Sequence, residues 1–432
     1  MSRVNPFQPN SPVAPGMFAG RYSQVEALEA ALRQTREGRP KSFMLTGERG
    51  IGKTSLLQYF KWIAQGHIDV QGDKMNFLVV DLDLDATTTD LGLIRRVNLA
   101  VSRELSKSEP ARSFLSTGWG FLSRVEAFGL SIREGNKASD QETLHDEFAH
   151  SLAETCNRIS GPDASSVFGA RYEGLILLID EADNAPKALR IGSFLKLLTE
   201  RVQRQGCDRL MIGLAGMPAL REVLRESHPS SLRILDELPL DALSRDDVSW
   251  AIDRALTVAN ETNEEKTTID DGGRSALINL SEGYPHFIQQ FGFSAFAADT
   301  DLVIDGDDVR RGAFGPLGAM ERIGDRYYRD DFYNKIQKDS YRQVLRIMAD
   351  NENRWVAKQV IRSKFRGSTT ILDNAIHALR ERKIILAKEG ERGMYRLQHR
   401  GFAFWIKLYT SAPQDLQNQL EATATRSEDE AT

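Results

Sequence analysis

The chain has 432 residues, of which 41% are hydrophobic and 27% charged, a composition typical of a globular protein with two or three domains. No apolar run reaches the roughly 18 residues that a membrane-spanning helix needs, and residues 1–16 hold four prolines but no apolar stretch of a signal peptide. We therefore expect a cytoplasmic protein without a membrane span. Its two cysteines, Cys156 and Cys207, are far apart in the sequence and lack metal-ligand spacing, so we expect buried thiols rather than a zinc site or a disulfide framework.

The net charge of −5 conceals a strong asymmetry along the chain. Residues 340–408 contain 15 Lys and Arg against 6 Asp and Glu, a net charge of +9, whereas residues 409–432 contain 1 against 5. Residues 1–339 carry 40 basic against 50 acidic side chains. Basic character is therefore confined to one segment near the C-terminus.

After an arm at residues 1–23, residues 24–258 alternate between helical and extended patterns. Helices are expected over residues 24–37, 55–64, 144–159, 191–205 and 245–257, and strands over residues 41–46, 76–81, 175–180, 209–215 and 234–238. The strand at 76–81 is nearly all apolar, as in a parallel sheet that is buried on both faces. The alternation predicts an α/β core with a doubly wound, mostly parallel sheet.

One stretch of this core, residues 91–141, does not follow the alternation. Residues 118–121 and 128–132 look like the two strands of a hairpin within otherwise helical sequence. We interpret the stretch as an insertion.

Two smaller domains and a tail follow the core. Residues 259–339 are predicted to form a helical lid and linker, helical only from residue 267 to about 314 and interrupted by a turn at 283–285. Residues 340–408 predict three helices at 341–349, 356–364 and 370–382, then two strands at 384–388 and 394–398, the pattern of a winged helix-turn-helix. Residues 409–432 have the composition of a disordered acidic tail.

Residues 47–54 have the form of a phosphate-binding loop. The glycines let backbone N–H groups turn towards phosphate oxygens, and the helix N-terminus that follows adds a favourable dipole. Lys53 is expected to reach the β- and γ-phosphates of ATP, and the Thr54 hydroxyl to ligate Mg²⁺. Because the loop follows a predicted strand and opens a predicted helix, we expect ATP to be bound by Gly47, Glu48, Arg49, Gly50, Ile51, Gly52, Lys53, Thr54 and Ser55.

The strand at 175–180 ends in two acids, Asp180 and Glu181, at the edge where open α/β sheets bind ligands. This is the form of a Walker B element, in which Asp180 would hold Mg²⁺ through water and Glu181 would act as general base for the attacking water. Residues 180–183 have the sequence Asp-Glu-Ala-Asp, which also suggests a DEAD-box helicase. The sequence shows no second helicase core, so we reject this reading. We therefore predict a P-loop ATPase.

These motifs resemble those of AAA+ and STAND ATPases, particularly the origin-recognition-like ATPases of bacteria and archaea that join an ATPase core to a lid and a winged helix. The resemblance extends over residues 5–408. Residues 5–7 and 18–21 are similar to the arm and box that line the adenine pocket in that group, which implies this role for Gly20, Arg21 and Tyr22. The turn at 283–285 looks like the GxP element of STAND lids, which would place Pro285 near the base; an ordinary helix-breaking turn is the alternative.

The sequence departs from these families at positions that govern hydrolysis. Residues 214–217 offer no polar sensor side chain after the strand, so hydrolysis is expected to be slow, and His286 stands nearest to where many AAA+ lids place an arginine. Arg233 is the candidate for an arginine finger that acts on a second copy of the chain, and Arg225 competes for this role. A switch in a homo-oligomer is favoured over a motor.

Two functions remain open. In the first, ATP controls the binding of double-stranded DNA through residues 354–400, whose basic side chains suit phosphate contacts. In the second, the chain is a STAND-type signalling ATPase whose winged helix and insertion bind a protein partner, because winged helices also serve as docking modules. A relict P-loop without activity is disfavoured because all four Walker side chains are present. The basic residues at issue are Lys358, Arg362, Lys364, Arg366, Arg380, Arg382, Lys383 and Arg392.

Overall fold

The computed structural model describes residues 3–12, 18–123 and 137–410, except residues 330, 337, 352, 353, 383, 389 and 399. The chain divides into two compact units. Pro12–Asp241 is here called the core unit, and Met1–Ser11 together with Ala242–Thr432 the C-terminal unit. The predicted boundary between core and lid at residue 258 therefore differs from the division by packing, and the first eleven residues belong with the C-terminal unit.

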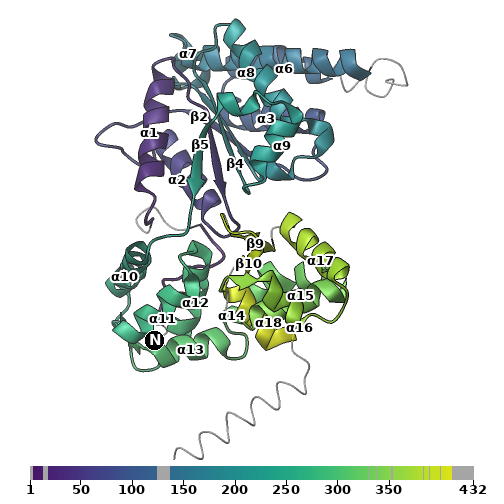
Figure 1. Ribbon diagram of the computed structural model, residues 1–432. Helices are drawn as coiled ribbons and strands as arrows, with labels where there is room; N and C mark the ends of the chain where they lie inside the picture. The colour runs from purple at the N-terminus through teal and green to yellow at the C-terminus, as the bar shows by residue number, and fades with distance from the viewer. Residues whose placement is uncertain are drawn as a thin grey trace, which may run out of the picture. The chain divides into compact units, whose positions relative to one another are not determined.

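The core unit is built on a parallel sheet (Figure 1). Its five strands have the order β2-β3-β4-β1-β5. Their bounds are β1 Phe43–Gly47, β2 Leu78–Asp83, β3 Leu175–Asp180, β4 Leu210–Gly216 and β5 Asp236–Leu240. Every residue of β1 and β4 is buried, as expected for strands covered on both faces. The predicted parallel α/β sheet is therefore confirmed, and the carboxyl ends of its strands meet at one edge.

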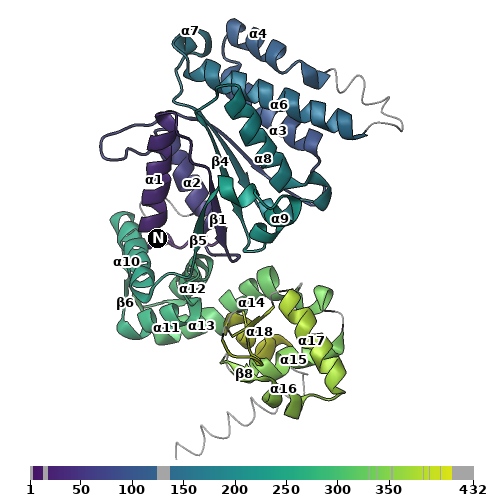
Figure 2. The same ribbon diagram turned by 45° about the horizontal axis from the view of Figure 1, so that its top comes forward.

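Helices cover both faces of this sheet (Figures 1 and 2). One face carries α1 (Tyr22–Arg36) and α2 (Lys53–Ala64), and the other carries α3 (Asp90–Leu105), α6 (Lys137–Ser160) and α8 (Ile191–Arg204). The remaining helices of the unit are α4 (Glu109–Gly118), α7 (Ala164–Phe168) and α9 (Leu220–Ser227), with short 3₁₀ turns at Ala182–Asn184, Lys187–Leu189 and Ser231–Ile234. Alternate strand residues thus supply two cores, one beneath each helical layer.

The predicted hairpin strand at residues 118–121 is wrong. Residue 118 ends helix α4, and the following residues continue in a turn and a helical stretch. Trp119 is buried, its ring packs edge-on against Phe148 of α6, and its indole N–H donates to the Thr155 hydroxyl at 3.1 Å. The glycines beside the aromatic residues suggested a strand, but packing against α6 selects the helical path. The second predicted strand, residues 128–132, lies outside the described residues.

Four helices make up the first part of the C-terminal unit: α10 (Arg245–Thr262), α11 (Asp271–Ser281), α12 (Pro285–Ala298) and α13 (Gly306–Phe314). Helix α12 packs against both α11 and α13. The prediction of helices alone was incomplete, because β6 (Thr268–Ile269) and β7 (Val303–Ile304) form a short parallel pair. These two-residue strands are too short to give a readable alternation in the sequence.

The N-terminal arm lies along α12. Phe7 is 1% exposed and its ring packs against Gly292, where an added Cβ would come within 2.5 Å of it. The Arg3 guanidinium donates to the Asp299 carboxylate at 2.5 Å, and the Asn5 side chain donates to the Phe293 carbonyl at 2.9 Å. The arm is therefore part of the packed C-terminal unit.

Residues 339–410, here called the C-terminal block, follow α14 (Ala319–Ile323) and two π-helical turns at Gly324–Tyr328 and Asp331–Lys335. The block contains helices α15 (Asp339–Ala349), α16 (Lys358–Lys364), α17 (Thr369–Glu381) and α18 (Arg400–Thr410). Strands β8 (Val356–Ala357), β9 (Ile385–Ala387) and β10 (Met394–Leu397) form an antiparallel sheet in the order β8-β10-β9. The three predicted helices and two predicted strands are present, but residues 356–357, predicted as the start of the second helix, form β8 instead, and α18 was not predicted.

Among the described residues, no helix combines the length and the apolar character that crossing a membrane requires.

Candidate nucleotide site

The predicted phosphate-binding loop joins β1 to α2 at the carboxyl edge of the sheet. Gly47 is the last residue of β1, and α2 begins at Lys53. Gly52, just before the helix, has a φ of 97°, which side-chain-bearing residues rarely adopt. At Gly47 an added Cβ would lie 2.8 Å from the Ile51 side chain and 2.9 Å from the Leu240 carbonyl. The two glycines are thus required by backbone conformation and by space.

Lys53 points back into this loop. Its ammonium donates to the carbonyls of Gly47 at 2.8 Å and Glu48 at 3.0 Å. Burial lowers the pKa of the Lys53 ammonium, and the charge of Asp180 opposes that shift. The loop therefore holds one partly buried cation beside backbone N–H groups at a helix N-terminus, which is an arrangement suited to phosphate.

Asp180 at the end of β3 lies beside the start of α2. The Thr54 hydroxyl donates to its carboxylate at 2.8 Å, and the Glu181 backbone N–H donates to the other carboxylate oxygen, also at 2.8 Å. Glu181 has a φ of 50°, a strained conformation for a residue with a side chain, and its exposed carboxylate accepts from Asn184 at 3.2 Å. The fold thus brings Lys53, Thr54 and Asp180 together, with Glu181 next to them in the chain.

The box before α1 also lies against the loop. The Arg21 side chain is buried and donates to the Ile51 carbonyl at 3.1 Å, and Gly20 has a φ of 64°. Phe18 stacks on Tyr59 of α2, with ring centroids 5.2 Å apart and planes 7° from parallel. Residues 18–21 are therefore fixed to the phosphate-binding loop and its helix, whereas Tyr22 is exposed.

The end of β4 lacks a polar side chain, as the sequence indicated. Gly216 ends the strand, and a Cβ there would lie 2.6 Å from the Asp183 carboxylate. That carboxylate instead accepts from the Met217 backbone N–H at 2.9 Å. A side chain at position 216 is thus excluded by the packing of Asp183.

Two acids in the second half of β2, Asp81 and the terminal Asp83, also belong to this edge and were not predicted as site residues. In the sheet register Asp83 pairs with Asp180, and Asp81 forms an ion pair with Lys61 of α2 at 2.7 Å. They line a pocket of about 90 Å³ together with Thr54 and Asp180. Burial, and then the charge of Asp180, raise the pKa of the Asp83 carboxyl. An acid at the end of a predicted strand was visible in the sequence. That it lies near Asp180 follows only from the sheet order, in which β2 neighbours β3.

Comparison with known proteins agrees with this geometry. Residues 17–212 match the family described as the AAA ATPase domain. This segment is an AAA ATPase domain. Its bounds enclose the box at residues 18–21, the phosphate-binding loop and the Walker B strand, so the predicted P-loop ATPase of the AAA+ class is confirmed.

Solved structures resemble the whole chain. The Aeropyrum pernix ORC2 protein, solved as ADPNP–ADP complexes, is 13% identical with a TM-score of 0.54, and the match covers 98% of this chain and 99% of that one. The A. pernix ORC1 protein in complex with DNA is 15% identical with a TM-score of 0.43 and coverages of 91% and 94%. The Pyrobaculum aerophilum Cdc6p structure is 11% identical with a TM-score of 0.40 and coverages of 93% and 97%. No curated protein sequence matches the chain. The first of these matches shows that the chain has the same fold as the A. pernix ORC2 protein.

Arg233 does not lie near the phosphate-binding loop of its own chain. It belongs to the 3₁₀ turn before β5, and it lines a cavity with Ser42, just before β1, and Asp236, at the start of β5. Because β1 and β5 are parallel, this is the amino edge of the AAA sheet, opposite the carboxyl edge that carries the loop. Arg233 is exposed, and so is Arg225 on α9.

Pro285 belongs to the C-terminal unit, where it is the first residue of α12. The preceding Gly283 has a φ of 77°, and its carbonyl accepts from the Leu243 backbone N–H at 2.9 Å. A Cβ at Gly283 would come within 2.3 Å of the Leu243 carbonyl, so the turn is closed against the start of α10. The proximity of Pro285 to a nucleotide base stays a prediction. The Arg326 guanidinium donates to the His286 ring at 3.5 Å.

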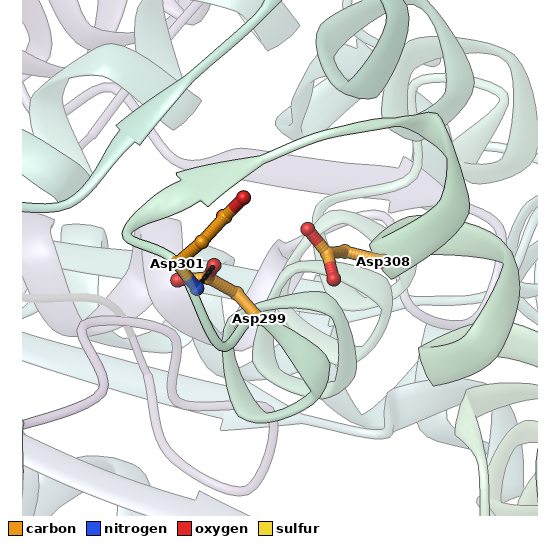
Figure 3. Close-up of side chains that lie close together, drawn as sticks. All are labelled: Asp299, Asp301 and Asp308. Carbon is orange, nitrogen blue, oxygen red and sulfur yellow. Dashed lines mark hydrogen bonds between the residues drawn. The ribbon is translucent and has the colours of Figure 1, made fainter.

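Three carboxylates of the C-terminal unit, Asp299, Asp301 and Asp308, approach one another between α12 and α13 (Figure 3). Asp299 accepts from Arg3 and from two backbone N–H groups, and Asp308 is paired with Arg311. The Asp301 carboxylate accepts from the backbone N–H of Val303, the first residue of β7, at 3.1 Å. We interpret this group as the anchor of the N-terminal arm and of the turn before β7.

The C-terminal block exposes most of the predicted basic side chains. The exposed residues are Arg362, Lys364, Arg366, Arg380, Arg382 and Arg392. Lys358 is less accessible and pairs with Asp373 of α17 at 2.6 Å. Lys383 lies outside the described residues.

Proposed function

We propose that this AAA protein is an ATP-dependent switch that hydrolyses ATP slowly and controls DNA binding through its C-terminal block. The observation that carries the proposal is the assembly of Lys53, Thr54 and Asp180 at one sheet edge, joined in the same chain to a strongly basic block. The fold shared with the A. pernix ORC2 protein, which was solved with ADPNP and ADP, supports adenine nucleotides as ligands.

Each Walker side chain has a distinct role in this proposal. Lys53 would leave its carbonyl partners and contact the β- and γ-phosphates, and the N–H groups of residues 47–55 would surround them. The Thr54 hydroxyl and the Asp180 carboxylate, 2.8 Å apart, are the oxygen donors that suit Mg²⁺, which neutralises phosphate charge when bound. Glu181 would accept the proton of the attacking water.

The β4 edge supports slow turnover. Because Gly216 and the Asp183 contact leave no polar side chain there, one γ-phosphate contact found in faster AAA+ enzymes would be missing. Slow hydrolysis suits a switch, in which the lifetime of the ATP state sets the duration of the signal.

We further propose that hydrolysis needs a second copy of the chain. Arg233 lies at the sheet edge opposite its own phosphate-binding loop, so a finger role requires the loop of a neighbouring subunit. A homo-oligomer would therefore couple ATP binding to assembly.

DNA is the partner that the charge distribution favours. The exposed residues Arg362, Lys364 and Arg366 follow one another at the end of α16 and in the turn before α17, and Arg392 lies in the turn between β9 and β10. If the block is a winged helix, these positions lie beside the recognition helix and on the wing, where phosphate contacts are made.

A protein partner is the second candidate, and two observations favour it. The Lys358–Asp373 ion pair neutralises one cation beside α17, and Val360 and Ile371 are large apolar side chains that are 40% and 46% exposed on α16 and α17. A contiguous exposed apolar patch marks a docking surface, and in this candidate function the two side chains would belong to one. In this case the AAA protein would be a STAND-type signalling ATPase.

A DNA-binding measurement distinguishes the DNA switch from the protein-docking candidate. Labelled duplex DNA is titrated with the full chain at two salt concentrations, with and without ATP and Mg²⁺, and binding is followed by fluorescence anisotropy. The DNA switch predicts binding that tightens with ATP and weakens steeply with salt. Replacing Arg362, Lys364 and Arg366 by alanine should lower the log–log salt slope by about 3. The matched control replaces Arg103, Lys107 and Arg112 of the core unit and should leave the slope unchanged.

Two results would reject the DNA proposal. The first is an absence of binding at low salt in both nucleotide states, and the second is an equal loss of binding in the two triple variants. Either result would leave the protein-docking candidate, with Val360 and Ile371 as the residues to replace next.

A further inference from the structure

A cavity of about 320 Å³ lies at the amino edge of the sheet in the core unit, opposite the edge that carries the phosphate-binding loop. Its walls come from the segment before β1, from α8, from the turn before β4 and β4 itself, and from the start of β5. The volume is at the small end of the range for ligand pockets, about 300–1,000 Å³. No residue of the nucleotide site lines this cavity.

The floor of the cavity is apolar. It is formed by Val202 of α8, by Leu210 and Ile212 of β4, and by the Cys207 thiol, and all four residues are buried. Cys207 and Cys156 are both free and buried, as predicted. An apolar floor of this kind suits the hydrocarbon part of a ligand, because contact with it removes apolar surface from water.

The mouth of the cavity carries charged side chains. Lys41, Arg233 and Asp236 belong to the lining, and all three residues are exposed. Lys41 and Asp236 form an ion pair at 3.5 Å. No carboxylate among the described residues pairs with the Arg233 guanidinium. Two cations against one anion, with one cation left over, favour an anionic ligand.

The Ser42 hydroxyl supplies a second hydrogen-bond donor. Its oxygen accepts from the Ile212 backbone N–H at 3.0 Å, and a hydroxyl has one proton in addition to its lone pairs, so this proton is left to be donated. The Ser42 carbonyl accepts from the Asp236 backbone N–H at 2.9 Å, which places Ser42 beside the segment that carries Arg233. A ligand oxygen in this cavity would therefore meet a guanidinium and a hydroxyl.

We propose that the cavity binds a small carboxylic acid with an apolar body. The hydrocarbon part covers the apolar floor, and the carboxylate accepts from the Arg233 guanidinium, whose planar fork fits both carboxylate oxygens. The Ser42 hydroxyl donates to the same group. Asp236 repels the carboxylate, but its ion pair with Lys41 offsets that charge. A neutral molecule would leave Arg233 unpaired, and a small anion without an apolar body would leave the floor in water.

The occupied cavity would also affect hydrolysis, and this consequence rests on the proposed function. The finger role requires Arg233 to reach the phosphate-binding loop of a neighbouring subunit. A carboxylate bound to Arg233 competes with that contact. The acid would thus act as an inhibitor whose site lies at the opposite edge of the sheet from the bound nucleotide.

Saturation-transfer NMR with the full chain tests the site in the absence of nucleotide. Octanoate has both an apolar body and a carboxylate, octanamide keeps the body without the charge, and acetate keeps the charge without the body. We expect octanoate to bind saturably, and each of the other two to bind at least about 10-fold more weakly. Octanamide that binds as tightly as octanoate, or octanoate that does not bind saturably, would overturn the proposal.

Two variants locate the binding in this cavity. Arg233→Ala should weaken octanoate binding by about 10-fold or more, whereas Arg225→Ala removes an exposed arginine from α9 and should have no effect. Thr199→Phe places a ring in the cavity and should abolish binding. Circular dichroism checks the fold. If Thr199→Phe unfolds, the exposed Arg233 decides alone, and equal affinity in Arg233→Ala and the wild type would reject the site.

Phosphate release measured with octanoate separates the site from its effect on hydrolysis. Octanoate should slow ATP hydrolysis by the wild type but not by Thr199→Phe. Octanoate that binds without slowing hydrolysis would refute the inhibition and leave the site in place. A chain that does not hydrolyse ATP would refute the proposed function, and the binding measurement, made without nucleotide, would still decide on the site.

Discussion

At the residue scale, the nucleotide site depends on a few side chains whose roles differ although they are close together. Lys53 is held by two carbonyls, Thr54 and Asp180 are bonded to each other, and Glu181 adopts a strained backbone conformation. Strained conformations outside glycine persist where the surrounding structure fixes them, often at functional sites. The left-handed backbone conformation of Glu181 could not be predicted from the sequence, because residues with side chains rarely adopt it.

Replacing Lys53 by alanine should remove the cation that meets the phosphates. We expect ATP affinity to fall by about 30-fold or more, the equivalent of ~2 kcal/mol or more for a buried charged contact. Titration of a fluorescent ATP analogue measures the loss. Lys61→Ala removes the same charge eight positions later on α2, where the lysine pairs with Asp81, and should bind nearly as well as the wild type. Unchanged affinity in Lys53→Ala would refute the assignment of the loop.

Asp83 should make stability depend on pH. Its folded-state pKa is raised above the ordinary value of 3.8, so the folded chain holds this proton more tightly than the unfolded chain. Stability must therefore fall as the pH rises from about 3.8 through the raised pKa. Asp83→Asn cannot lose a proton, so it should have a higher Tm than the wild type at neutral pH, and the difference should shrink towards pH 4. A difference in Tm that is constant across this range would contradict the prediction.

At the scale of elements, the N-terminal arm is joined to helix α12 by complementary shapes. Gly292 leaves the space that the Phe7 ring occupies, and Arg3 lies 4.8 Å over the Phe296 ring while it pairs with Asp299. The chain thus enters the C-terminal unit, passes through the whole AAA domain, and returns at residue 242. The arm consequently stabilises a unit that is distant from it in the sequence.

Phe7→Ala should destabilise the C-terminal unit. Removing a fully buried phenylalanine costs ~3–5 kcal/mol, since transfer free energy is lost and a cavity remains beside Gly292. Calorimetry should show that the C-terminal unit unfolds at a lower temperature, whereas the unfolding temperature of the core unit should change little. Val4→Ala is the matched control, because Val4 is 61% exposed in the same arm. Equal effects of the two substitutions would show that the arm contributes through its backbone alone.

At the scale of the whole molecule, the proposed finger leads to a complementation experiment. Lys53→Ala lacks a working phosphate-binding loop and Arg233→Ala lacks the finger, so each alone should lose most ATPase activity, by up to about 1,000-fold for the finger. Mixed together, the two variants form sites that combine an intact loop with an intact finger, and activity should partly return. Phosphate release measures this, and Arg225→Ala in place of Arg233→Ala is the control. If mixing restores nothing, Arg233 does not act between subunits.

The sequence by itself determined the parts of this protein whose signals are local. The glycine spacing of the loop, the apolar strand that ends at Asp180 and the basic segment near the C-terminus each depend on neighbouring residues, and each is present as expected. One local pattern gave a wrong prediction. Residues 118–121 have a strand-like sequence, but the burial of Trp119 against α6 favours the helical conformation.

Only the tertiary structure decided which distant segments meet. The order of the strands places Asp83 beside Asp180, and packing brings the N-terminal arm to α12. Parallel strands and helical layers join segments through crossovers of dozens of residues, and no local pattern encodes the partner at the far end. The chemistry of the phosphate-binding loop could therefore be predicted from the sequence, whereas the acidic residues beside it could be located only from the way the chain packs.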